Sequence, residues 1–198
     1  MTATQIRISS GRLVDLNDFK PEDVCPMSIE RSLNQIKRFT GHYNFHEPLT
    51  VAQHTLLVRA ISRVLYGKGE FIDLGARIHD FPEAYYGDLS SPLKKHFGDF
   101  YREKIKLIDD VVINHFWPEN SSYYDYYDVD TGELHNWYKT FQDVEHQVKM
   151  ADTISLRIEQ SMMWGSVPPE PEIIQFFEQQ DTRAMFLECF ETKHVKLV

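Results

Sequence analysis

The sequence predicts an all-α protein, and three observations lead to this fold class. Apolar residues recur at helical spacings of three and four through most of the chain, proline and glycine separate these segments, and alternating strand patterns are nearly absent. At 198 residues the chain fits one domain. We therefore expect a single helical domain over 1–198 with its core at about 28–163, an irregular N-terminal arm and extra C-terminal helices.

The first third of the chain changes from an arm to helices. Residues 1–27 lack a helical period and predict an irregular or weakly stranded arm. From Ser28 the apolar residues follow helical spacing, at Ile29, Leu33 and Ile36. The segment 41–48 is rich in histidine and aromatic residues and predicts a loop.

The next two helices are marked by their ends. Thr50 and Gln53 form the pattern of a capping box, which predicts a helix beginning there and ending at Gly67. A further helix is expected over 71–81. Pro82 should kink or end it, because proline removes an intrahelical hydrogen bond.

The second half predicts more helices around one irregular segment. A short helix should begin at Ser91-Pro92, followed by a helix over 100–116. The segment 118–132 is rich in Tyr and Asp and has no helical period. A long helix is expected over 134–164, and Pro168-Pro169 should separate it from one or two C-terminal helices. The inner face of the long helix is predicted to carry Trp137, Phe141, Val144, Val148, Ala151 and Ile158.

Composition narrows the class of function. A net charge of −9 argues against binding of duplex nucleic acid, which needs a basic surface, but still permits a small anionic substrate. No apolar run approaches the length of a membrane span. Cys25 and Cys189 form no CxxC pattern and no signal peptide is recognised, so we expect reduced thiols in a cytoplasmic protein.

Three predicted helices each place a potential metal ligand among apolar residues. His54 lies on the apolar face of its helix, His79-Asp80 ends a buried helix, and Asp152 lies beside Ala151. Singly, each has an ordinary explanation: a core histidine with a satisfied hydrogen bond is common, and a His-Asp pair arises easily by chance. Together they predict one mixed nitrogen and oxygen metal site, because buried charges are tolerated chiefly when paired or bound to metal.

The order of His54, His79-Asp80 and Asp152 resembles the HD superfamily of metal-dependent phosphohydrolases. The stretch His-Asp-Phe-Pro-Glu-Ala-Tyr-Tyr-Gly-Asp-Leu-Ser-Ser-Pro-Leu-Lys is similar to bacterial 5′-deoxyribonucleotidases and to phage-encoded deoxynucleotide hydrolases. Arg-Phe-Thr-Gly-His, beginning at Arg38, resembles the phage group, which includes dATP triphosphohydrolases. The resemblance covers about 28–163, and leaves the segment 118–132 and the C-terminal helices unassigned.

This resemblance implies a set of site residues. The metal ligands would be His54, His79, Asp80 and Asp152, binding a divalent transition metal such as Zn, Co or Mn. Glu83 would be the catalytic residue that orients the attacking water or protonates the leaving oxygen. Its ordinary alternative is a solvated carboxylate at a helix end.

The same resemblance implies substrate contacts. Asp88 would hold the sugar 3′-hydroxyl, although an Asx turn is an alternative. Arg38 and Phe39 would lie near base and phosphate. Lys94 and Lys149 suit a polyphosphate, and could equally be surface lysines.

We therefore expect hydrolysis of deoxynucleotides at the α-phosphate, with dATP giving deoxyadenosine and triphosphate. A 5′-deoxyribonucleotidase acting on monophosphates is the alternative, and a domain binding (p)ppGpp or a cyclic dinucleotide is a more distant one. The partners expected are a small deoxynucleotide and further copies of the chain in a homo-oligomer, with neither duplex nucleic acid nor membrane. If the chain is phage-encoded, its place is the host cytoplasm.

Overall fold

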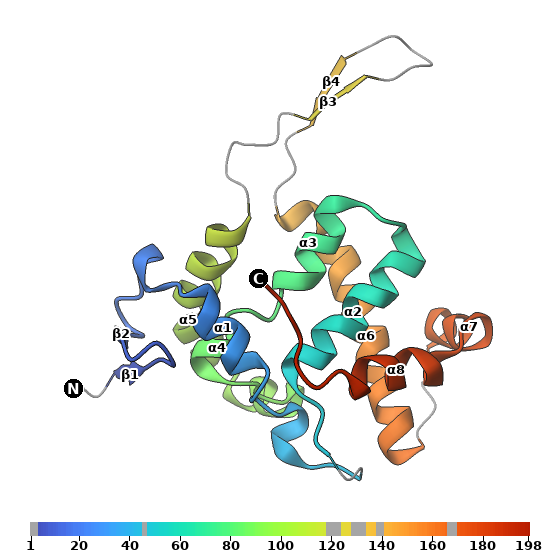
Figure 1. The fold of residues 1–198 in the computed structure, drawn as a ribbon, viewed down its shortest axis with the longest axis horizontal. Coiled ribbons are helices and arrows are strands. Elements are labelled where there is room, and N and C mark those ends of the chain that lie inside the picture. Colours follow the sequence, from blue (N-terminus) through green and yellow to red (C-terminus); the bar gives the residue numbers. More distant parts are fainter. Residues whose placement is uncertain (1–3, 45–46, 118–123, 128–133, 138–140, 166–169) are drawn as a thin grey trace.

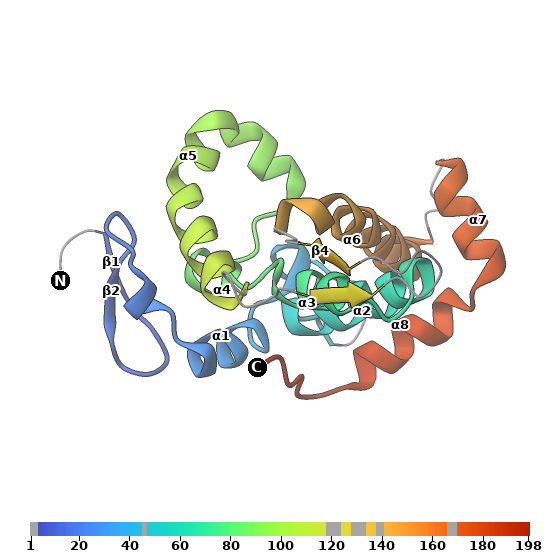
Figure 2. The ribbon, with the colours of Figure 1, turned by 90° about the horizontal axis from the view of Figure 1, so that it is seen from above.

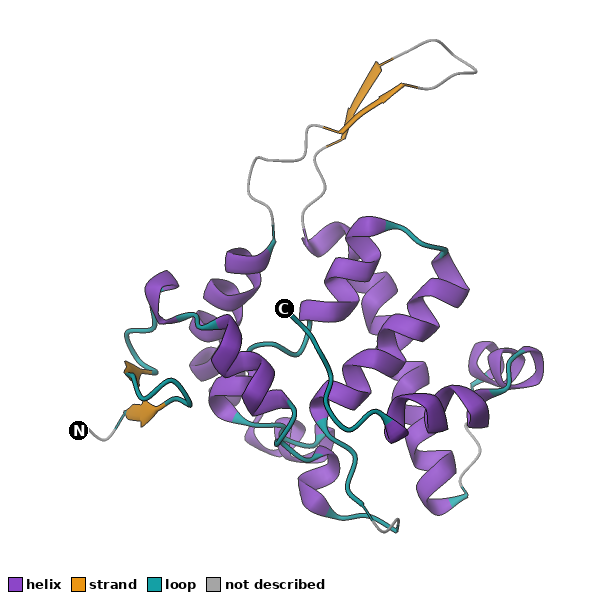
Figure 3. Ribbon diagram, in the orientation of Figure 1, coloured by secondary structure: helices purple, strands orange, loops and turns teal. Residues whose placement is uncertain are grey.

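The computed structural model shows a mostly helical protein, which confirms the predicted fold class (Figure 3). The structure describes residues 4–44, 47–117, 124–127, 134–137, 141–165 and 170–198. The helices are α1 (Pro26–Leu33), α2 (Val51–Tyr66), α3 (Glu70–Ile78), α4 (Glu83–Tyr86), α5 (Ser91–Phe116), α6 (Phe141–Trp164), α7 (Pro171–Gln179) and α8 (Thr182–Glu191). Two 3₁₀ turns, η1 (Pro21–Asp23) and η2 (Arg38–Gly41), and four short strands, β1 (Gln5–Arg7), β2 (Leu13–Asp15), β3 (Tyr124–Tyr127) and β4 (Leu134–Trp137), complete the described elements.

Helices α2, α3 and α6 pack against one another at the centre of the fold (Figure 1). On one side lie α1, α4, α5 and the N-terminal strands, and on the other lie α7 and α8 (Figure 2). The three central helices carry the potential metal ligands, so their packing decides the geometry of the site.

Helix α2 begins as its sequence predicts. The backbone N–H of Gln53 donates to Oγ1 of Thr50 at 3.1 Å, and the backbone N–H of Thr50 donates to Oε1 of Gln53 at 2.9 Å. These reciprocal bonds satisfy two backbone donors at the helix N-terminus. The C-cap is Gly67, whose positive φ of 75° suits glycine. The capping-box prediction is therefore confirmed.

Helix α3 ends earlier than predicted. Its last residue is Ile78, His79 is its C-cap, and α4 begins at Glu83 after a turn. Pro82 has no backbone N–H with which to continue α3, and it disfavours helical backbone in the residue before it, Phe81. The turn therefore takes Asp80 and Phe81 out of the predicted helix.

The predicted long helix over 134–164 is wrong in its first part. Residues Leu134–Trp137 form β4, which pairs antiparallel with β3, with Tyr124 opposite Trp137. Tyrosine and tryptophan favour strands, and a partner strand of similar composition lies within the preceding segment. Trp137 is therefore on a strand, and α6 begins only at Phe141.

The two helices predicted at Ser91-Pro92 and over 100–116 are parts of one element, α5. Gly98 interrupts its helical backbone with φ 59° and ψ −137°, a conformation that is strained for residues with a side chain. The N-terminal arm holds the small β1–β2 hairpin, in agreement with the weak strand character expected there.

Buried apolar residues also come from the two ends of the chain. Val14 and Phe19 of the arm and Val195 and Leu197 near the C-terminus belong to it. The C-terminal segment is also held by hydrogen bonds, because Asn34 exchanges two bonds with the backbone of Val195 at 2.8 and 2.9 Å. Within the described ranges, no helix is both long enough and apolar enough to cross a membrane.

Candidate metal centre

His54 lies completely buried on the inner face of α2. Its Nε2 atom is 3.4 Å from Oδ2 of Asp80 and 3.3 Å from Oδ1 of Asp152. Its other ring nitrogen, Nδ1, is 2.6 Å from Oε1 of Glu159. The ring is therefore held between two carboxylates on one side and a third on the other.

His79, the C-cap of α3, faces the same point. Its Nδ1 is 2.9 Å from the carbonyl oxygen of Ala76, which can only accept, so Nδ1 carries a proton. Its Nε2 lies 3.2 Å from Oδ2 of Asp80. The backbone contact thus leaves Nε2 as the atom available for a metal.

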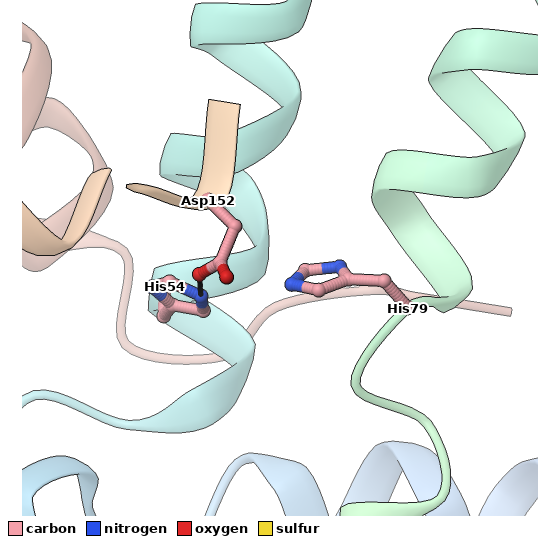
Figure 4. Close-up of side chains that lie close together, drawn as sticks. All are labelled: His54, His79 and Asp152. Carbon is pink, nitrogen blue, oxygen red and sulfur yellow. Dashed lines mark ion pairs between the residues drawn. The ribbon is translucent and has the colours of Figure 1, made fainter. Parts of the chain in front are cut away.

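His54, His79 and Asp152 form a group that could hold a metal ion (Figure 4). One ligand atom from each lies within 4.8 Å of the others, and the three residues come from α2, the end of α3, and α6. Nε2 of both histidines and Oδ2 of Asp80 are buried without a hydrogen bond among the described residues. Buried polar atoms without a partner are costly, so these converging atoms fit a bound cation.

The charges of the site also fit a cation. Burial alone would raise the pKa of Asp80, but the two histidines hold it below its ordinary value, and His54 does the same for Asp152. Burial and Arg38 would lower the pKa of His54, yet Glu159 and Asp152 together raise it to about 10. The carboxylates are therefore ionised, and the strong preference of His54 for positive charge is one that a metal would satisfy.

Gly75 brings α3 close to α6 at this site. A Cβ atom added to it would lie 3.1 Å from Cγ2 of Val144 and 3.1 Å from Cγ2 of Val148. The missing side chain therefore allows the close approach that places His79 opposite Asp152.

A cavity of about 940 Å³ opens beside the candidate ligands. It is lined by acidic, basic and aromatic side chains, including Phe39, His79, Asp80, Glu83, Asp88, Lys94, Lys95, Lys149, Asp152, Arg157 and Trp164. Its volume is at the upper end of the usual range for a small-molecule site.

Glu83 is the first residue of α4, and its side chain is only 3% exposed. Burial and the nearby Asp80 raise the pKa of Glu83 well above its ordinary value, while Lys94 opposes this rise. The Nζ of Lys94 donates to Oε1 of Glu83 at 3.1 Å. The structure therefore brings Lys94 to the predicted catalytic residue, a contact that the sequence did not indicate.

Arg38 and Asp88 contact each other at the edge of the cavity. The guanidinium of Arg38 is 3.5 Å from Oδ2 of Asp88 and 3.3 Å from Oε2 of Glu159. Both predicted substrate residues thus line the cavity, but each already has a partner within the protein. Burial raises the pKa of Asp88, and Arg38 opposes that rise.

Phe39 follows Arg38 in a strained turn. Phe39 and Thr40 have positive φ values of 55° and 58°, which are uncommon outside glycine and a marked outlier for β-branched threonine. The turn places the Phe39 ring 5.3 Å from that of Trp164, edge to face, where both line the cavity. Trp164 was not among the predicted contacts.

Lys149 lies at the rim of the cavity. Its Nζ is 3.0 Å from Oδ2 of Asp152, one helical turn away as the sequence predicts, and its side chain is 74% exposed. It can therefore approach both the candidate metal site and bulk solvent.

Glu159 is a second site residue that the sequence analysis missed. It lies two helical turns after Asp152 on α6, is completely buried, and contacts both His54 and Arg38. Burial favours its protonated form, but His54 and Arg38 hold the pKa of Glu159 below its ordinary value. The sequence signal that could have found it is a glutamate directly after Ile158 of the inner face, although this position does not show which residues the carboxylate meets.

Fold and site together define a mostly helical protein with a largely buried His/His/Asp group that could hold a metal ion. A search with protein-family models finds no match to this chain.

Two curated proteins show a distant relationship. An uncharacterized protein of Rhodobacter capsulatus, RCAP_rcc00048, is 37% identical over 98 residues, which cover 49% of this chain and 50% of that protein. An uncharacterized protein of Escherichia coli K12, YfdR, is 32% identical over 108 residues, which cover 54% of this chain and 55% of that protein. The chain thus matches about half the length of these relatives.

Proposed function

We propose that this protein is an HD-type metal-dependent phosphohydrolase that cleaves deoxynucleotides at the α-phosphate. The observation that carries the proposal is the convergence of ligand atoms from His54, His79 and Asp152 within 4.8 Å, beside a large cavity. Asp80 joins them as the fourth ligand, because its Oδ2 lies 3.2–3.4 Å from both imidazoles and has no hydrogen bond to any residue that the structure describes.

This ligand set of two imidazoles and two carboxylates suits Zn, Co, Mn or a similar divalent ion. Such an ion, when bound, supplies polarisation of a phosphoryl oxygen and a water of lowered pKa. The protein contributes the fixed orientation of the ligands, which the contacts of both histidine Nδ1 atoms maintain.

Glu83 acts as the general acid or base. Burial and Asp80 raise its pKa above the ordinary value, which favours a proton on this carboxyl, and burial shields it from bulk water. In the reaction, the oxygen of water bonds to the α-phosphorus and the bond from phosphorus to the 5′-oxygen breaks. The proton lost by water is returned to the 5′-oxygen, and Glu83 lines the cavity where this transfer takes place.

The cavity has chemistry for each part of a deoxynucleotide. Phe39 and Trp164 offer aromatic surfaces for the base, and buried Asp88 offers an acceptor for the sugar 3′-hydroxyl. Lys94 and Lys149 contribute positive charge for phosphates, and their positions on the cavity wall allow contact with a chain of phosphates.

The preferred substrate is dATP, cleaved to deoxyadenosine and triphosphate. One observation favours a second candidate, a 5′-deoxyribonucleotidase restricted to monophosphates. Lys94 and Lys149 are already paired with Glu83 and Asp152, so neither ammonium is fully free to neutralise β- and γ-phosphates.

The experiment that tests the function is a panel of deoxy- and ribonucleotides at each phosphorylation level, assayed with Mn, Co and Zn in ¹⁸O-labelled water. We expect dATP to give labelled triphosphate and unlabelled deoxyadenosine in the earliest samples. Activity confined to monophosphates would establish the second candidate.

Appearance of dADP and orthophosphate as first products would contradict cleavage at the α-phosphate.

A variant tests the role of Glu83 in the same assay. Glu83→Gln should retain metal while kcat falls by roughly 10²–10⁴, the usual contribution of general acid–base catalysis.

A further inference from the structure

Glu159 is a charged side chain in the interior of the protein, on the same face of α6 as Asp152 and Ser155. It is completely buried, and a carboxylate removed from water is costly unless it is paired and hydrogen-bonded. Its partners therefore indicate what it does.

The two oxygens of Glu159 contact two different residues. Oε1 is 2.6 Å from Nδ1 of His54, and Oε2 accepts from Nη2 of Arg38 at 3.3 Å. The hydroxyl of Ser155 lies 3.2 Å from Nδ1 of His54 and 3.4 Å from Oε1 of Glu159. One carboxylate is thus shared between the candidate metal centre and the wall of the cavity.

For His54, the contact selects one tautomer. An ionised carboxylate can only accept, so Nδ1 must carry the proton that it donates to Glu159. In the metal-bound protein the lone pair is then on Nε2, the atom that faces Asp80 and Asp152, because the metal replaces the second proton of the imidazolium. Glu159 therefore fixes both the tautomer and the plane of this ring.

For Arg38, the contact with Glu159 is one of two ion pairs that hold its guanidinium group. The guanidinium is held between Glu159 and Asp88, and the backbone N–H of Arg38 donates to Leu49 at 2.9 Å. Arg38 directly precedes the strained turn that carries Phe39. Glu159 is thus connected through one residue to the sugar and base side of the cavity.

We propose that Glu159 is a positioning residue that orients His54 for metal binding and Arg38 for substrate binding. This inference rests on the proposed function and assigns Glu159 a role in both halves of the site. A purely structural ion pair would affect stability alone, whereas a positioning residue also affects metal affinity and KM.

The test measures binding of Co²⁺ to metal-free protein, together with its visible spectrum, for the parent and Glu159→Gln. We expect affinity to fall about 10- to 100-fold, the usual effect of losing a partner of a metal ligand, with an altered Co²⁺ absorption band. At saturating Co²⁺, KM for dATP should rise as well. Glu178→Gln, an exposed charge-matched change on α7, should leave all three unchanged.

Unchanged Co²⁺ affinity and spectrum in folded Glu159→Gln would overturn the inference and leave the proposed function standing. Failure of the parent to bind Co²⁺ would instead overturn the proposed function. If Glu159→Gln does not fold, Arg38→Gln/Glu159→Gln removes both buried charges, and parent-like Co²⁺ affinity in it would overturn the inference.

A measurement on the unchanged protein complements the variants. Long-range ¹H–¹⁵N spectra of the Zn²⁺-loaded parent should show His54 protonated at Nδ1, with a strongly downfield proton from its bond to a carboxylate. Protonation at Nε2 would overturn the inference without reference to any variant.

Discussion

The Nζ atom of Lys94 lies 3.1 Å from Oε1 of Glu83, so the candidate catalytic carboxylate has its own counter-charge. Lys94 follows the first turn of α5, and Glu83 begins α4. Burial raises the pKa of Glu83 and Lys94 limits that rise. Lys94 therefore adjusts the proton affinity of the proposed acid–base residue as well as adding charge to the cavity.

Lys94→Met should move the limb of the pH–rate profile that belongs to Glu83 to higher pH. If Glu83 acts as a base in its ionised form, its pKa sets the acid limb. If it acts as an acid in its protonated form, its pKa sets the alkaline limb. Both move upward, because loss of the ammonium raises the pKa of Glu83 further. The measurement is kcat/KM against pH with Lys104→Met, an exposed change on α5, as the control. If this limb does not move in Lys94→Met, Lys94 does not influence the pKa of Glu83 and the prediction is contradicted.

Asp88→Asn should weaken the preference for deoxyribonucleotides over ribonucleotides by about tenfold or more, because a site built around a polar contact discriminates strongly. Asp88 lies at the cavity with its side chain 5% exposed, so its acceptor is shielded from water. The measurement is the ratio of kcat/KM for dATP and ATP, with thermal unfolding to verify folding. An unchanged ratio would assign Asp88 to its ion pair with Arg38 alone.

Gly75→Ala should lower metal affinity and lower the free energy of unfolding by up to about 2 kcal/mol. The new methyl group would meet Val144 and Val148 at 3.1 Å and push α3, with His79, away from α6. Overpacking costs about 1–3 kcal/mol, and alanine regains about 1 kcal/mol of helix propensity. Metal titration and urea unfolding measure the two effects.

Adding Val144→Ala to Gly75→Ala makes room for the methyl group and should restore part of the affinity. Metal binding by Gly75→Ala within twofold of the parent would show that the approach of α3 to α6 does not set the ligand geometry.

Asp73→Asn should lower the free energy of unfolding by about 1 kcal/mol near neutral pH. Asp73 of α3 lies 2.8 Å from Arg59 and 2.7 Å from Arg63 of α2, so it joins two ligand-bearing helices. Burial opposes ionisation of Asp73, but the two arginines hold its pKa below the ordinary value. The contribution is therefore full above the unfolded pKa of about 3.9 and is lost as pH falls through the folded pKa.

Urea unfolding of the parent and Asp73→Asn across this pH range measures the difference. It should narrow as pH falls below about 4. Asp99→Asn, which removes an exposed pair with Arg102, serves as the control and should have little effect at any pH. A difference that is independent of pH would contradict an ionic origin.

The sequence predicts most of the helical fold because its indications are local. Thr50 and Gln53 lie about one turn apart at the start of the helix that they cap. Gly67 ends the helix because glycine readily adopts the positive φ required there. The β3–β4 pairing was missed because Trp137 stands four residues before Phe141, a helical spacing, while its strand partner lies elsewhere in the chain.

The candidate ligands were anticipated from their order along the chain, and the structure brings His54, His79 and Asp152 together. Glu159 was not anticipated, because nothing near it in sequence shows that its carboxylate meets His54 and Arg38. Likewise, the left-handed backbone conformation of Thr40 could not be predicted, because threonine rarely adopts it. The position of Glu159 and the backbone of Thr40 depend on contacts between segments that are distant in sequence, so local patterns could not predict them.

The most direct test of the metal centre is the metal content of purified protein after chelation and reloading with Zn²⁺, Co²⁺ or Mn²⁺. Mass spectrometry of the parent should find about one ion per chain. Asp80→Asn and His79→Ala should lose most of this ion and the hydrolysis of deoxynucleotides together, because each removes an atom from the converging set. Full metal occupancy in either folded variant would contradict the centre that His54, His79, Asp80 and Asp152 are proposed to form.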